Sequence, residues 1–209
     1  MRGSRAGLII SRFLLVAGVV LLAIPAGIAI DAKLYGRHAR DRMNELPPDE
    51  PKSAGPPAEG ELIGWMEVPR LGLSAPISEG TEKRTLLRSV GHIEGTPLPG
   101  PDGNAGLAGH RDIHFRKLEE IGAGDLVRVT TRQGKFEYLV DTTMVVKPDR
   151  VDLLDESASP ALTLVTCYPF RYMGTAPKRF VVRATMKDAT ESTARTALAA
   201  PAPLLTRGG

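Results

Sequence analysis

Residues 162–183 have the sequence LTLVTCYPFRYMGTAPKRFVVR and include the only cysteine of the chain. The first six are apolar or β-branched, which is typical of a buried strand. We expect this strand to end near Cys167, because Pro169 cannot donate a hydrogen bond to a sheet ladder. A loop rich in Pro and Gly follows, and residues 180–182 then predict a returning strand. A cysteine at one strand end thus faces an arginine, Arg179, at the start of the next strand. This pair can do nucleophilic chemistry if a histidine joins it.

The chain around this stretch predicts short strands with few helices. We expect strands over 62–68, from about 73 to 77 and over 104–112, and a hairpin over 126–131 and 135–146 that turns at 132–134. Short helical segments are expected over 81–90, with Thr81 as the cap, and over 115–121, and a helical turn or loop over 149–157. Residues 91–101 have the composition of a loop. The predicted fold is therefore mainly β, a closed or nearly closed barrel with short helices.

Composition excludes several classes of function. The net charge is only +3 and basic residues form no stripe interleaved with aromatic residues, so nucleic acid is not an expected partner. A single cysteine excludes an internal disulfide framework and any multi-cysteine metal site. We see no acidic cluster arranged for calcium, and we expect Asp112 and Asp125 to be surface or turn residues. The sequence therefore predicts neither a required metal nor a cofactor.

Residues 1–30 predict a membrane anchor. Three arginines precede an apolar run over 13–30, whose 18 residues are near the lower limit for crossing a bilayer. A cleavable signal peptide is the alternative, with Gly27 and Ala29 before the cut. We favour an uncleaved single-pass transmembrane helix that leaves the large C-terminal domain outside the cytoplasm.

Three further segments complete the predicted organisation. Residues 31–60 form a juxtamembrane segment, which can continue as a helix over 31–45, followed by a Pro-rich linker over 46–60. The folded domain spans 61–188. Residues 189–209 are rich in Ala, Pro and Thr without periodicity, and we expect a disordered tail.

Four histidines are candidate partners of Cys167. A reactive thiolate needs an acid/base or a positive neighbour, whereas a lone cysteine is by default a small buried hydrophobe. His38 precedes the linker and is too far away, and His114 could lie at the surface. His92 lies in a Gly-rich loop and is a serious rival. His110 ends a short strand, so its side chain can point into the same end of a barrel as Cys167.

These residues together resemble a known family. The strand LTLVTC at 162–167, with an arginine twelve residues after the cysteine, resembles the active-site signature of sortases, the cysteine transpeptidases of bacterial surfaces. Ala108-Gly109-His110 matches the upstream histidine site of that family. Residues 92–100, 109–112, 167–170 and 176–180 are similar to the class D branch. The resemblance covers about 62–186, and a preceding membrane anchor fits it.

The resemblance implies a role for each site residue. Cys167 would attack the carbonyl of a sorting signal, typically Leu-Pro-x-Thr followed by Gly or Ala, and form a thioester. His110 would protonate the leaving amine and deprotonate the incoming one. Arg179 would position the substrate and stabilise the oxyanion. Arg183 is the alternative, about 13 Å further along the strand. Thr166 is either a supporting hydroxyl near the site or a packed strand residue.

The same resemblance implies the partners and leaves two alternatives. The substrates would be surface proteins that carry the signal, and the acceptor an amine of a peptidoglycan precursor or a pilin lysine, at the outer face of the cell membrane. A cysteine hydrolase using the same site is one alternative, and a non-catalytic anchored binding module with a core cysteine is the other. An L,D-transpeptidase is disfavoured because no Ser-x-Gly-Cys element is present.

Overall fold

The computed structural model describes residues 3–45 and 55–187, so the predicted tail lies outside the described residues. The strands and helices follow one another as α1 (Gly3–Glu45), β1 (Leu62–Val68), η1 (Pro69–Leu71), β2 (Leu73–Glu79), α2 (Lys83–Arg88), β3 (Val90–His92), β4 (Asn104–Gly109), η2 (Arg116–Glu120), β5 (Leu126–Thr131), β6 (Gly134–Val146), η3 (Val151–Leu154), β7 (Ala161–Tyr168) and β8 (Lys178–Met186), where η denotes a short 3-10 helix.

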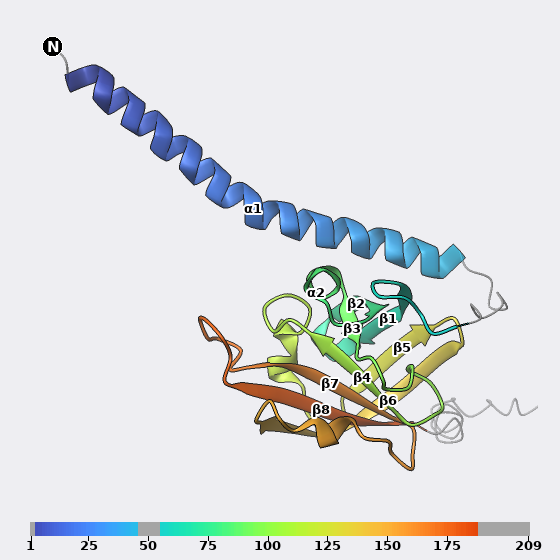
Figure 1. The fold of residues 1–209 in the computed structure, drawn as a ribbon. Helices are drawn as coiled ribbons and strands as arrows, with labels where there is room; N and C mark the ends of the chain where they lie inside the picture. Colours follow the sequence, from blue (N-terminus) through green and yellow to red (C-terminus); the bar gives the residue numbers. More distant parts are fainter. Residues whose placement is uncertain (1–2, 46–54, 188–209) are drawn as a thin grey trace, which may run out of the picture.

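The strands close into a barrel in the order β1-β2-β3-β4-β7-β8-β6-β5 (Figure 1). Most neighbours are antiparallel, but β2 and β3 are parallel, and so are β4 and β7. The parallel pair β4 and β7 matters for function, because the C-terminal ends of both strands meet at the same rim of the barrel. The predicted mainly β fold with a closed barrel is confirmed.

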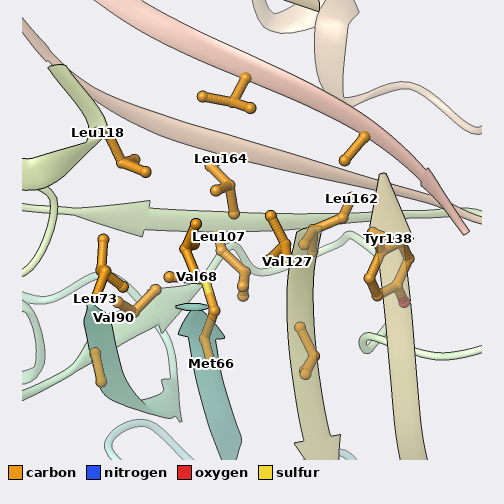
Figure 2. Close-up of a cluster of buried hydrophobic side chains, with 14 of the residues drawn as sticks. Met66, Val68, Leu73, Val90, Leu107, Leu118, Val127, Tyr138, Leu162 and Leu164 are labelled. Atoms are coloured by element: carbon orange, nitrogen blue, oxygen red, sulfur yellow. The ribbon is translucent and has the colours of Figure 1, made fainter. Parts of the chain in front are cut away.

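Apolar side chains from all sides of the barrel fill its interior (Figure 2). Met66, Leu107, Leu162 and Leu164 are completely buried. Tyr138 is the largest fully buried side chain, and its hydroxyl group donates to the carbonyl oxygen of Gly100 at 3.2 Å and lies 3.0 Å from the amide nitrogen of the same residue. Burial raises the pKa of Tyr138 to about 12. The core thus contains a hydroxyl group whose hydrogen bonds are satisfied, which holds residue 100 against β6.

Several local predictions differ from the structure. The expected loop over 91–101 begins with the strand β3, which is too short to show a period of two in sequence. Gly91 is required there, because a Cβ atom would come within 2.2 Å of the Gly80 carbonyl oxygen. Thr81 does not cap α2, since the residue before that helix is Glu82, with no side-chain cap. The end of the predicted linker contacts the barrel, where the Gly60 amide donates to the Glu79 carbonyl oxygen at 2.8 Å.

Of the two expected environments of Asp125, the surface or a turn, the structure shows the turn. Asp125 lies in a turn, as predicted, but it is only 8% exposed. Its carboxylate accepts hydrogen bonds from the Arg70 guanidinium and, at 2.8 Å, from the amide of Gly122. The bond from Arg70 is the main reason that the pKa of Asp125 is lowered. The carboxylate therefore stabilises the turn that precedes β5.

A single helix, α1, covers both the predicted anchor and the segment over 31–45. Its second half lies beside α2, β1 and β2, whereas its first half projects away from the barrel (Figure 1). Asp31 accepts a bond from Arg88 at 2.6 Å, and the Tyr35 hydroxyl lies 2.9 Å from that of Ser78. The predicted membrane span is not found, since no helix among the described residues combines the length and hydropathy needed to cross a bilayer.

Candidate active site

Three neighbouring strands bring the predicted site residues to one rim of the barrel. In the parallel pair of β4 and β7, Gly109 lies opposite Thr166. The next residues, His110 just after the end of β4 and Cys167 near the end of β7, therefore lie at the same level of the barrel. On the other side of β7, Cys167 lies opposite Arg179 of β8. Cys167 is the central member of the group, with the histidine on one side and the arginine on the other.

Cys167 is not part of the barrel core. Side chains alternate along a strand, and Leu162 and Leu164 of β7 point into the buried interior. Cys167 is on the opposite face of the strand, where its free thiol is partly exposed. The default interpretation of a lone cysteine as a buried hydrophobe therefore does not hold.

Thr166 fixes the relative position of the two strands. Its side chain is 3% exposed, and its hydroxyl donates to the Gly109 carbonyl oxygen at 2.7 Å. Gly109 has no room for a side chain, because a Cβ atom would lie 2.7 Å from the buried ring of Phe115. Thr166, which precedes Cys167, and Gly109, which precedes His110, are thus both fixed by close contacts. The Thr166 hydroxyl thus joins the end of β7 to the backbone that precedes His110.

The candidate residues line a common cleft of about 280 Å³. Its walls come from the segment after β4, from β7 and from the loop before β8. The lining residues are His110, Arg111, Asp112, Cys167, Gly174, Thr175, Ala176 and Arg179. A cysteine, a histidine and two arginines thus line one open space.

Arg179 and Arg183 lie on the same face of β8 but have different neighbours. Arg179 pairs with Cys167, whereas Arg183 pairs with Thr163, four residues earlier on β7. Arg183 donates to the Leu153 carbonyl oxygen at 2.8 Å, which holds η3 against the barrel. Arg179 donates through Nη1 to the carbonyl oxygens of Ala176 and Lys178, at 3.4 and 3.0 Å. Of these two arginines of β8, the one that lines the cleft is therefore Arg179.

His92, the rival histidine, is buried away from the cleft. It is 3% exposed, its Nδ1 lies 2.8 Å from the Glu79 carboxylate, and its Nε2 lies 3.0 Å from the Pro97 carbonyl oxygen. Both ring nitrogens are thus occupied by structural partners. His38 lies on α1, exposed, with its Nδ1 2.8 Å from the Leu34 carbonyl oxygen.

His114 is the histidine whose environment the sequence did not indicate. The sequence left open a place at the surface, but its Nε2 atom is buried and has no hydrogen-bond partner among the described residues. Burial lowers the pKa of His114 to about 4, the charge of nearby His110 adds to this, and the Leu87 carbonyl opposes it. The ring therefore remains neutral at pH 6.5, at which an exposed histidine would be half protonated.

The environment of His114 predicts a specific acid sensitivity. Because its pKa is lower in the folded than in the unfolded chain, the unfolded state binds more protons as pH falls from 6.5 toward 4. The free energy of unfolding should fall by up to about 3 kcal/mol across that window. Urea unfolding of the protein and of His114→Phe at pH 7 and pH 4.5 measures this loss. The difference between the two pH values should shrink in His114→Phe and persist in His38→Gln, and an equal difference in all three proteins would contradict this account.

Arg111 is a feature of the site that the sequence did not assign. Arg111 lies in the stretch 109–112 that resembles class D sortases, but the sequence indicated no role for it. In the structure its guanidinium contacts the loop between β7 and β8 at several points.

Among the described residues, no group of three or more His, Cys, Asp or Glu side chains is placed to hold a metal ion. The predicted independence from metals remains a prediction.

Comparisons with known proteins show the family to which the chain belongs. Residues 66–187 match the sortase domain family. The chain is 31% identical over 189 residues to sortase D of Bacillus subtilis, covering 83% of this chain and 96% of that protein. It is 25% identical over 126 residues to sortase A of Bacillus anthracis, covering 58% of each chain.

Solved structures show the same likeness. A sortase D5 transpeptidase of Clostridium perfringens superposes with a TM-score of 0.66 at 25% identity, covering 76% of this chain and 99% of that one. Sortase C of the same species gives a TM-score of 0.58 at 28% identity, covering 78% and 89%. The protein therefore belongs to the sortase family of cysteine transpeptidases.

Proposed function

We propose that Cys167, His110 and Arg179 form the active site of a transpeptidase that transfers surface proteins from a Leu-Pro-x-Thr-type signal to an amine acceptor. The observation that carries this proposal is the strand register, which sets Cys167 beside the strand that precedes His110 and directly opposite Arg179. The position of all three side chains on one cleft supports it.

The proposed reaction has two steps. The Cys167 thiolate attacks the carbonyl carbon of the peptide bond after the threonine, and a C–S bond forms as the C–N bond breaks. The leaving amine takes its proton from His110, which leaves a thioester and a neutral imidazole. The incoming amine then gives a proton to His110 and attacks the thioester, and the Cys167 thiolate is released.

Arg179 is suited to stabilise negative charge in both steps. A guanidinium does not lose its proton, so it cannot serve as the general acid or base. It can stabilise the negative charge that develops on the carbonyl oxygen in each tetrahedral intermediate. Its hydrogen bonds in the described part of the chain use Nη1, which leaves Nη2 and Nε available for a bound substrate.

The identity of the product tests the proposed reaction. The domain is incubated with Leu-Pro-x-Thr-Gly and Leu-Pro-x-Thr-Ala peptides, with and without an amine acceptor, and the products are weighed by mass spectrometry. A peptide ligated to the amine is the expected result. Release of the free acid alone, even with a high concentration of amine, would instead indicate a cysteine hydrolase.

The two arginines of β8 give a matched pair of substitutions. We expect Arg179→Gln to lower kcat by about 100-fold or more, since it removes the charge that faces the oxyanion. Arg183→Gln removes the same charge from the same face of the strand, but opposite Thr163, and should change kcat by only a few-fold. Steady-state kinetics on the peptide measures both. A larger loss in Arg183→Gln would contradict the assignment of Arg179.

We further propose that the N-terminal part of α1 anchors the enzyme at the outer face of the cell membrane. The support is the run of exposed apolar side chains from Ile9 to Ile24, several of them more than 60% exposed, on the half of the helix that projects from the barrel. Membrane fractionation of the full chain and of a chain beginning near residue 55 tests this. Sedimentation of the full chain alone is expected, and recovery of both in the soluble fraction would overturn the anchor.

A further inference from the structure

The loop between β7 and β8 forms an exposed wall of the candidate site, and one side chain, that of Arg111, hydrogen-bonds to it at three carbonyl groups. Residues 171–175 of this loop are all exposed, with Met173 96% exposed. Arg111 donates from Nη1 to the Pro169 carbonyl oxygen at 2.9 Å, and from Nη2 to the carbonyl oxygens of Tyr172 and Gly174 at 2.7 and 3.2 Å. Its guanidinium also lies 5.8 Å from the centre of the Tyr172 ring.

These contacts join the two sides of the cleft. Arg111 directly follows His110, whereas the loop connects Cys167 to Arg179. Gly174, Thr175 and Ala176 of the loop line the cleft, and the Ala176 carbonyl oxygen accepts one of the two hydrogen bonds of Arg179. A displacement of the loop would thus alter the cleft wall and the arginine together.

Within residues 3–45 and 55–187, other attachments of the loop are few or lie at its ends. Phe170 packs at the start of the loop against the core and against Phe180, with ring centres 5.2 Å apart. Arg171 approaches Glu119 at 3.6 Å, but its side chain is 87% exposed, and such ion pairs contribute little. The bonds from Arg111 have a planar, charged donor that reaches three carbonyl groups at once, which a lysine ammonium cannot reproduce in that geometry.

We infer that Arg111 is a positioning residue for transfer, which holds the loop over 169–177 so that the cleft is formed between His110 and Arg179. This inference rests on the function proposed above. Arg111 acts through the loop and does not touch the reacting atoms. Because a misplaced wall weakens both the seating of the peptide and the alignment of the scissile bond, we expect Arg111→Gln and Arg111→Lys to lower kcat/KM by about 10- to 100-fold, with a raised KM contributing.

The test pairs kinetics with a direct measurement of the loop. Arg111→Gln, Arg111→Lys and the control Arg171→Gln, which removes the same charge from the loop itself, are compared with the unchanged enzyme. Steady-state rates on the signal peptide give kcat and KM. The rate of trypsin cleavage after Arg171 under native conditions, read by mass spectrometry, reports how often the loop leaves its folded position. It is measured in every protein except the control, which lacks this cleavage site. Alkylation of Cys167 by iodoacetamide, which needs no formed peptide site, reports on the thiol alone.

We expect the Arg111 variants to show the loss in kcat/KM, faster cleavage after Arg171 and an unchanged alkylation rate, whereas Arg171→Gln keeps its activity. Rates within twofold of the unchanged enzyme would overturn the inference and leave the proposed function intact. A loss of activity with an equally protected loop would also overturn it, because Arg111 would then act on the substrate itself. If the unchanged enzyme does not transfer any peptide, the proposed function fails together with the positioning role, while the trypsin comparison still decides whether Arg111 restrains the loop.

Discussion

Replacement of Cys167 by alanine is expected to abolish transfer of the signal peptide, with a loss of at least about 10⁴-fold in kcat. The reason is chemical, since the two-step reaction requires a thiolate that forms the C–S bond and later leaves. The side chain is small, partly exposed and on the outer face of β7, so its loss creates no core cavity. Initial rates with a fluorogenic peptide and an amine acceptor measure the effect.

The control for this prediction is stability. The melting temperature of Cys167→Ala should match that of the unchanged enzyme, and Ser157→Ala, a substitution of similar size at a partly exposed position, should retain full activity. Residual turnover in Cys167→Ala above the uncatalysed rate would point to another nucleophile. Because the chain has one cysteine, that nucleophile would not be a thiol.

His110→Ala is expected to lower kcat by about 10²- to 10⁴-fold, the usual contribution of a general acid and base. Both steps lose their proton donor or acceptor, so neither a better leaving group nor a higher amine concentration alone should restore the rate fully. Steady-state kinetics on the signal peptide with an amine acceptor measures the loss.

The other histidines provide the comparison for His110. His38→Gln, on the exposed face of α1, should keep its activity. His92→Gln should act mainly on stability, since His92 is buried between Glu79 and Pro97. Normal activity in His110→Ala would contradict the assignment, and the acid and base would have to be sought elsewhere in the cleft.

The residue types of the two C-terminal strands made the positions of Cys167 and Arg179 predictable from sequence. The β-branched run before Cys167, the proline after it and the basic residues before Phe180 specify two antiparallel strands, and this pairing is the one that sets Cys167 opposite Arg179. The glycine and alanine residues before His110 likewise indicated a tightly packed strand. These are local signals, and local signals survive in the folded protein when the neighbouring strands agree with them.

The remaining features depend on contacts between distant segments, which no local pattern encodes. β3 has three residues and is a strand only because β2 and β4 supply its ladder partners. The burial of Asp125 depends on Arg70, 55 residues earlier, and the role of Arg111 depends on carbonyl groups about 60 residues later. Residue composition identifies such groups as polar, and only the fold shows which of them are structural.

The central claim is that Cys167 forms a covalent thioester with the signal peptide in the cleft beside His110 and Arg179. Intact-mass spectrometry of the enzyme mixed with a Leu-Pro-x-Thr-Gly peptide and quenched in acid tests it most directly. The account predicts an adduct with the mass of the peptide up to its threonine, located on Cys167 by peptide mapping, that disappears when an amine is added and is absent from Cys167→Ala. A peptide that is cleaved with no adduct on Cys167, or an adduct that persists in Cys167→Ala, would contradict it.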